Sequence, residues 1–265
     1  MNFVRHYLLA VQFFTRIPVT GALACWVGYS PAMLRASAAH FPGVGWLVAA
    51  AACMAYAAAA VVLPATHFSP LAAAVACTIT TVLLTGGFHE DGLADVADGL
   101  GGGGDRERAL QIMKDSRVGA FGAMALALAL LAKVSLLAVL GSRGLSHALT
   151  ALAAAHVVSR LCPLVLIRAL PHVGDADGSK SKPLADRISG SALATAVLWC
   201  LAPLALAAHF HSAFFVAGVL LATGVALLWM YRLFARRLQG FTGDCLGATQ
   251  QVCEIAFYGG AAALL

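Results

Sequence analysis

Long apolar runs separated by short polar segments dominate the pattern along this chain. A helix that crosses the roughly 30 Å hydrocarbon core of a bilayer needs about 20 apolar residues. The pattern predicts membrane-spanning helices near residues 43–63, 69–87, 119–140, 145–169, 190–208, 212–231 and 248–265. The shorter segment 4–16 carries charged and polar residues, which predicts a helix at the membrane interface. We therefore expect an all-α polytopic membrane protein of about seven transmembrane helices, folded as a single domain over residues 1–265.

The composition agrees with this prediction. Hydrophobic residues make up 61% of the chain and charged residues only 11%, and the mean hydropathy is +0.85. Soluble domains carry about a quarter charged residues, so an ordinary soluble enzyme, a disordered chain and a nucleic-acid-binding module are excluded. The seven cysteines are scattered without a C-x-x-C pair, which indicates neither a disulfide framework nor a zinc site.

The charges predict which side of the membrane each turn occupies. Three predicted turns hold no basic side chains other than Arg143 and three histidines, and they lie at 64–68, 141–144 and 209–211. Because loops rich in Lys and Arg stay in the cytoplasm, the opposite, basic side is predicted to be cytoplasmic. Every carboxylate lies on or near that side. The cytoplasmic loops expected to form an active-site face are 88–118, 170–189 and 232–247.

The run 86–99 is the most informative stretch of the sequence. On a helix, Asp91, Asp95 and Asp98 stand at positions i, i+4 and i+7, and thus share one face. Three like charges on one face would destabilise a free helix, whereas one or two Mg²⁺ ions would make the arrangement favourable. The alternative is a solvated acidic surface at the end of a span. His89 and Glu90 fit either a site or an ordinary polar boundary.

A second polar stretch follows four consecutive glycines at 101–104. Asp105 is predicted to cap the next helix. Lys114, Ser116 and Arg117 offer two cations and a hydroxyl that suit phosphate oxygens, although cations here would also anchor the next span. The polar loop 175–182 is either a solvated turn or a contact to a polar substrate.

Several polar residues fall inside later spans. Arg160, with His156 one turn earlier, is expected to face a cavity or a partner, with snorkelling as the alternative. Lys133 is expected to snorkel outward and to have no catalytic role. The last span carries a stripe of polar residues that should face the protein interior and line a site, namely Asp244, Gln251 and Glu254.

An acidic metal site beside basic residues on a membrane protein favours phosphoryl transfer between amphiphilic substrates. A cation transporter is the alternative from a different class, since transporters also use carboxylates within the membrane. Transport favours acids near the bilayer midplane, and these cluster at its edge.

The chain also resembles the cobalamin synthase family, described systematically as the adenosylcobinamide-GDP ribazoletransferases. The resemblance rests on motifs that occur in order along nearly the whole chain, at 14–18 (FTRIP), 41–45 (FPGVG), 87–99 (GFHEDGLADVADG), 113–119 (MKDSRVG), 159–160 (SR) and 243–248 (GDCLGA). It implies an enzyme of the cytoplasmic (inner) membrane that joins adenosylcobinamide-GDP to α-ribazole or its 5′-phosphate and releases GMP, with Mg²⁺ as cofactor. It leaves open a homo-oligomer and contacts with other cobalamin-assembly enzymes.

The resemblance also suggests roles for individual residues. Those expected to act in catalysis are Asp91, Asp95, Asp98 and Asp244. The metal ligands are expected among Asp91, Asp95, Asp98, Glu90 and Glu254. Substrate binding is expected of Lys114, Ser116, Arg117, Arg160, His89 and Gln251. The acidic run is also similar to the motif of CDP-alcohol phosphotransferases but lacks its longer spacing, which makes a phospholipid synthase the weaker alternative.

Overall fold

The computed structural model describes residues 2–174 and 188–265, so the polar loop segment 175–182 lies outside the described residues. The described residues form helices and one isolated bridge between His172 and Phe241. The N-terminal helices are α1 (Asn2–Phe14), α2 (Gly21–Val27), α3 (Pro31–Ser37), the 3-10 turn η1 (Ala38–His40), α4 (Phe41–Val62) and α5 (Ser69–Thr85). The middle helices are α6 (Phe88–Gly101), α7 (Arg106–Met113), α8 (Ala120–Arg143), α9 (Leu145–Val158) and α10 (Cys162–Ala169). The last are α12 (Gly190–Phe210), α13 (Ala213–Arg237) and α14 (Gly243–Leu264).

Five helical stretches of the described chain are long and apolar enough to cross a membrane. They are Pro31–Val62, Ala120–Arg143, Leu145–Ala169, Gly190–Phe210 and Ala213–Arg237. A sixth arises if the bent pair α5 and α6 forms one broken span. The sequence pattern predicted about seven, because it also counted the last helix, α14. That helix exists, but it buries its polar residues inside the protein rather than presenting a uniformly apolar surface.

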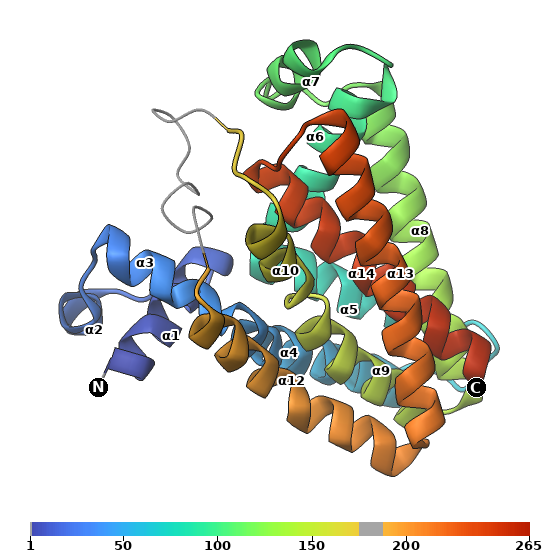
Figure 1. The fold of residues 1–265 in the computed structure, drawn as a ribbon. Helices are drawn as coiled ribbons and strands as arrows, with labels where there is room; N and C mark the ends of the chain where they lie inside the picture. Colours follow the sequence, from blue (N-terminus) through green and yellow to red (C-terminus); the bar gives the residue numbers. More distant parts are fainter. Residues whose placement is uncertain (1, 175–187) are drawn as a thin grey trace.

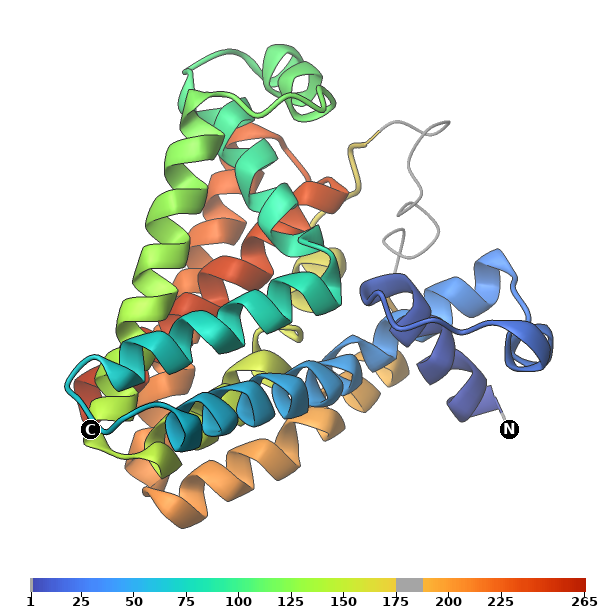
Figure 2. The same cartoon turned by 180° about the vertical axis from the view of Figure 1, so that it is seen from behind.

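The helices meet at one end of the molecule and diverge at the other. The turns between α4 and α5, α8 and α9, and α12 and α13 gather at the end that also holds the C-terminus (Figure 1). The ring of His147 stacks on that of His211 there, with 5.0 Å between centroids. From this end α4 and α12 run toward α1–α3, whereas α8 and α13 run toward α7 (Figure 2). The three turns that the charge pattern assigned to one side therefore do lie together.

Two glycines produce the sharp bend between α5 and α6. Gly86 and Gly87 both have φ near +69°, a left-handed conformation that costs glycine little. Their amides bond back to the carbonyls of Leu83 and Val82, which ends α5, and α6 leaves at 89°. A Cβ on Gly86 would also overlap the guanidinium of Arg16. The acidic motif consequently starts at the middle of the molecule and runs to the diverging end (Figure 2).

Stacked aromatic rings connect the N-terminal helix to the start of α6. Phe14 of α1 stacks on Phe41 of α4 with 4.0 Å between centroids, and Phe41 stacks on His89 with 5.6 Å. Both phenylalanines are buried. The first turn of α6 is thus held by packing as well as by the glycine bend, which gives the acidic face a fixed direction.

Candidate functional site

The acidic face predicted on a helix is present on α6. Asp95 lies within electrostatic range of three other carboxylates, those of Asp91, Asp98 and Asp244. Asp91 is exposed and the other three are half-buried. The structure therefore brings together the four aspartates that the sequence analysis proposed for catalysis, although Asp244 lies about 150 residues away along the chain on α14. We call these four residues the aspartate cluster.

A glycine sets the close approach of the two helices that carry the cluster. A Cβ on Gly92 would lie 2.7 Å from the carbonyl oxygen of Asp244, so no larger residue fits there without a shift of α14. On the other side, Thr242 donates its hydroxyl to Asp244 Oδ2 at 3.2 Å and accepts from the amide of Cys245. The start of α14 is thereby fixed against the face of α6.

Asp98 connects the aspartate cluster to the second polar motif. Its Oδ2 accepts from the amide of Gly119 at 2.7 Å, and its Oδ1 accepts from that of Gly122 at 2.8 Å. Free amides at a helix N-terminus need acceptors, and the side chain of the preceding residue usually supplies one. Gly119 at the N-cap of α8 has no side chain, so the carboxylate of Asp98 on α6 provides the acceptor instead. The aspartates and the segment 114–119 consequently form one structural unit.

The basic residues of that segment are exposed beside the cluster. Arg117 donates Nη2 to Asp115 Oδ2 at 2.5 Å and Nε to Oδ1 at 2.9 Å. These hydrogen bonds from Arg117 lower the pKa of Asp115 to about 2. Lys114 and Ser116 are exposed too. The three residues predicted to bind phosphate are thus accessible, and the Arg117 side chain, 86% exposed, is free to change partners.

The glycine-rich run and α7 are attached to the end of α13. Asp105 caps α7 by accepting the amide of Arg108 at 2.8 Å, as predicted. Arg106 donates to the carbonyl of Leu238 at 2.7 Å, and Arg237 donates to the carbonyls of Leu100 and Gly104. These arginines attach the segment to the end of α13 through main-chain carbonyls, contacts that the sequence pattern did not reveal.

Glu254 lies apart from the aspartate cluster, in a buried ionic network between α8, α9 and α14. Its Oε1 is 3.1 Å from Lys133 Nζ, and its Oε2 is 3.4 Å from His156 Nδ1. Gln250 and Tyr258 also donate to this carboxylate, at 2.6 and 3.3 Å. The side chain is 1% exposed. Both oxygens of Glu254 are engaged by these partners, so its position does not support the prediction that it joins the aspartates as a metal ligand.

Lys133 corrects a second expectation. Instead of snorkelling outward it is 2% exposed and points into the protein. Its Nζ donates to Gln251 Oε1 at 2.8 Å, and Gln251 Nε2 in turn donates to Glu90 Oε1 at 3.1 Å. The reason is electrostatic. Glu254 provides a buried counterion, and this ion pair offsets the cost of burying the Lys133 ammonium, so the side chain does not extend to the membrane interface. Gln251 therefore joins Lys133 to the first turn of α6.

Arg160 is only 2% exposed. It therefore lies inside the protein, and the alternative that it snorkels to the membrane surface is wrong. Its Nη1 donates to the carbonyl of His156 at 2.6 Å, and its guanidinium lies 5.7 Å from the ring centre of Phe41. Three buried polar atoms around this network have no hydrogen-bond partner among the described residues: Arg160 Nε, His89 Nε2 and Glu90 Oε2. An unsatisfied buried group costs about 1–3 kcal/mol, so a water molecule or a polar substrate group would be stabilised there.

The aspartate cluster has the chemistry of a magnesium site without a closed ligand cage. No three His, Cys, Asp or Glu side chains of the described residues converge as a ready metal-binding group. Mg²⁺, however, is commonly bound by one or two carboxylates together with water and substrate phosphates. The aspartate cluster offers only oxygen donors, of which three side chains are half-buried and one is exposed. Together with the basic residues of the segment 114–119, this composition fits that mode of binding.

Comparison with known proteins identifies the family. The profile of the family described as cobalamin-5-phosphate synthase matches residues 6–262. The chain belongs to this family. A protein of Polaromonas naphthalenivorans named adenosylcobinamide-GDP ribazoletransferase is 62% identical, with all of both chains covered. One of the same name from Vibrio cholerae is 42% identical over 95% of this chain and 91% of its own. No solved structure matches the chain.

Proposed function

We propose that this member of the cobalamin-5-phosphate synthase family transfers adenosylcobinamide phosphate from adenosylcobinamide-GDP to α-ribazole or α-ribazole 5′-phosphate and releases GMP. The observation that carries the proposal is the full-length identity of 62% to a protein named for this transfer. The aspartate cluster supports it independently, because a diphosphate substrate needs cationic neutralisation beside carboxylates that bind the cation.

Asp91, Asp95 and Asp244 are the proposed ligands for Mg²⁺, with the substrate diphosphate and water completing its coordination. When bound, the ion would neutralise the charge of the diphosphate and of the departing GMP. Asp98 has a different main task, since both of its oxygens already accept amides of α8. It holds Lys114 and Arg117 beside the cluster, where these cations bind the phosphate oxygens.

The transfer forms one P–O bond and breaks another. The hydroxyl of the ribazole attacks the phosphorus that carries cobinamide, and the bond from that phosphorus to the oxygen of GMP breaks. The proton of the hydroxyl passes to a carboxylate of the aspartate cluster. The buried network holds Glu90 through Gln251, so that the first turn of α6 keeps its direction while the substrates bind.

We further propose that the aspartate cluster faces the cytoplasm and that the end with the C-terminus faces the opposite side of the inner membrane. The support is the distribution of charge, because the gathered turns are poor in Lys and Arg whereas the diverging ends of the helices are rich in them.

The test is a two-substrate assay on the purified protein in nanodiscs. Adenosylcobinamide-GDP and α-ribazole 5′-phosphate are supplied together or singly, with Mg²⁺ or with EDTA, and GMP and corrinoid products are separated by chromatography. We expect product only with both substrates and Mg²⁺. Product in EDTA would refute the metal proposal alone. Absence of product from folded protein would refute the transfer, and CDP-alcohol substrates and cation flux would be tested next.

A further inference from the structure

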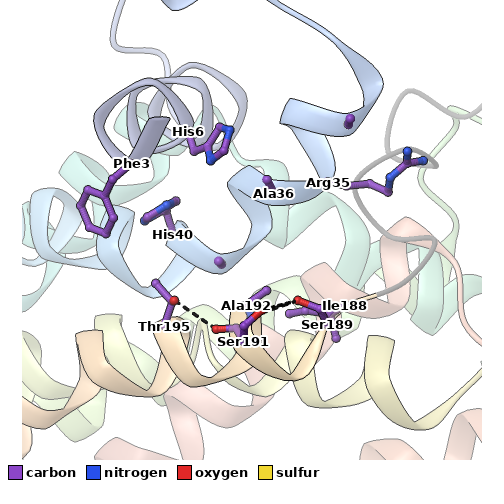
Figure 3. Close-up of a pocket in the computed structure, with 12 residues that line it drawn as sticks. Phe3, His6, Arg35, Ala36, His40, Ile188, Ser189, Ser191, Ala192 and Thr195 are labelled. Atoms are coloured by element: carbon purple, nitrogen blue, oxygen red, sulfur yellow. Dashed lines mark hydrogen bonds between the residues drawn. The ribbon is translucent and has the colours of Figure 1, made fainter. Parts of the chain in front are cut away.

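A cavity of about 710 Å³ lies apart from the aspartate cluster, between α1, the α3–η1 segment and the start of α12 (Figure 3). Its volume falls in the range of small-molecule sites, about 300–1,000 Å³. Phe3 and several alanines supply an apolar wall, and the polar groups face it from both sides (Figure 3). None of the residues used above for the transfer reaction lines this cavity.

The polar lining suits an anion. The described polar residues that line the cavity are His6, Arg35, His40, Ser189, Ser191 and Thr195, with no carboxylate among them. Arg35 is exposed at the end of α3 and its guanidinium has no hydrogen-bond or ion-pair partner among the described residues, so it can reach a ligand. An arginine next to hydroxyl and imidazole donors is the combination that recognises phosphate oxygens.

His40 gives the cavity a donor. The residue is 3% exposed, and Trp199 Nε1 donates to its Nδ1 at 3.3 Å. Because Nδ1 accepts, the proton of the neutral ring is on Nε2. Among the described residues no hydrogen bond involves that nitrogen, and the atom itself is not fully buried, so it opens onto the cavity. An N–H that opens onto a cavity without a partner in the protein can donate to an acceptor atom of a ligand.

The first turn of α12 lies on the opposite side. Ser189 caps this 21-residue helix by accepting the amide of Ala192 at 3.1 Å, and its hydroxyl is 3.0 Å from that of Ser191. Thr195 donates its hydroxyl to the main-chain carbonyl of Ser191, and both residues line the cavity (Figure 3). The partial positive charge at a helix N-terminus adds to the attraction for an anion placed between Ser191 and Arg35.

We propose that this cavity binds the phosphate group of an organic phosphate, between Arg35, His40 and the first turn of α12, with the apolar or aromatic part of the ligand against Phe3. Two sources supply that chemistry. One is a soluble phosphorylated nucleoside such as α-ribazole 5′-phosphate, and the other is the headgroup of an anionic phospholipid at the membrane surface.

The experiment measures binding directly in maltoside micelles, which contain no phosphate. In one arm, equilibrium dialysis compares α-ribazole 5′-phosphate with α-ribazole. In the other, native mass spectrometry compares retention of phosphatidylglycerol with that of diacylglycerol. Arg35→Gln and Ser191→Ala are tested with Arg143→Gln, an exposed arginine at the other end of the molecule, as the matched control.

We expect one phosphorylated ligand to bind more tightly than its phosphate-free counterpart. Arg35→Gln should weaken that binding about tenfold or more, as loss of a charge-assisted hydrogen bond does, and Ser191→Ala should weaken it less. Arg143→Gln should leave it unchanged. The arm in which this occurs identifies the source. The proposal is overturned if neither phosphorylated ligand is preferred, or if the Arg35 variant binds like the control. Turnover is not a readout, so these results are independent of the transfer reaction.

Discussion

Removal of the Lys133 ammonium is the sharpest test of the buried network. Lys133→Met keeps the apolar stem and deletes a group that lies 3.1 Å from Glu254 and 2.8 Å from Gln251. The Lys133 and Glu254 side chains are 3% and 1% exposed, so bulk water does not reach this pair. Loss of one member of a buried ion pair typically costs 3–5 kcal/mol, and we expect Lys133→Met to lower the free energy of unfolding by about that amount.

A double-mutant cycle separates this electrostatic effect from loss of packing. The assay is reversible unfolding of the purified protein in mixed micelles, followed by circular dichroism for Lys133→Met, Glu254→Gln and the double variant, with Arg143→Met as an exposed control. Because the double variant removes both members of the Lys133–Glu254 pair, it should be more stable than the sum of the single effects predicts, by about 2 kcal/mol or more. A strictly additive double variant, or a Lys133→Met protein as stable as the control, would refute the reasoning.

Three further predictions concern the candidate site, and a fourth concerns the orientation in the membrane. Asp91→Asn and Asp95→Asn should each abolish GMP release and leave the unfolding midpoint within experimental error, and activity retained by both variants would contradict the metal assignment. Asp98→Ala should lose activity and also about 1–2 kcal/mol of stability, because it removes the cap of α8, measured in the same unfolding assay; unchanged stability would show that the cap is dispensable. Arg117→Ala should raise the KM for adenosylcobinamide-GDP more than that for the ribazole in initial-rate kinetics, and an unchanged KM would argue against phosphate binding. Alkaline phosphatase fused after Leu265 should be active in cells, and an inactive but expressed fusion would invert the proposed orientation.

The sequence predicted the helical membrane fold and the aspartate face because both depend on spacing within one helix. The positions of Asp91, Asp95 and Asp98 determine that they share a face, whatever packs against it. Likewise the turns poor in Lys and Arg were grouped by charge alone. The sequence did not reveal that a segment predicted as the span 69–87 ends at a right-angled bend, although the pair Gly86–Gly87 marks the place.

Only the tertiary structure decided which polar groups meet across helices. The same polar stripe on α14 places Asp244 with the aspartates and Glu254 with Lys133, two different sites, because the helix continues inward for almost three turns between them. Asp98 caps a helix whose first amide lies 21 residues further along the chain, and only the packing of α6 against α8 brings the two together. Lys133 lies inside the protein because a counterion on another helix makes burial favourable. Periodicity fixes the direction of a side chain on its own helix, whereas its partner depends on how the helices pack.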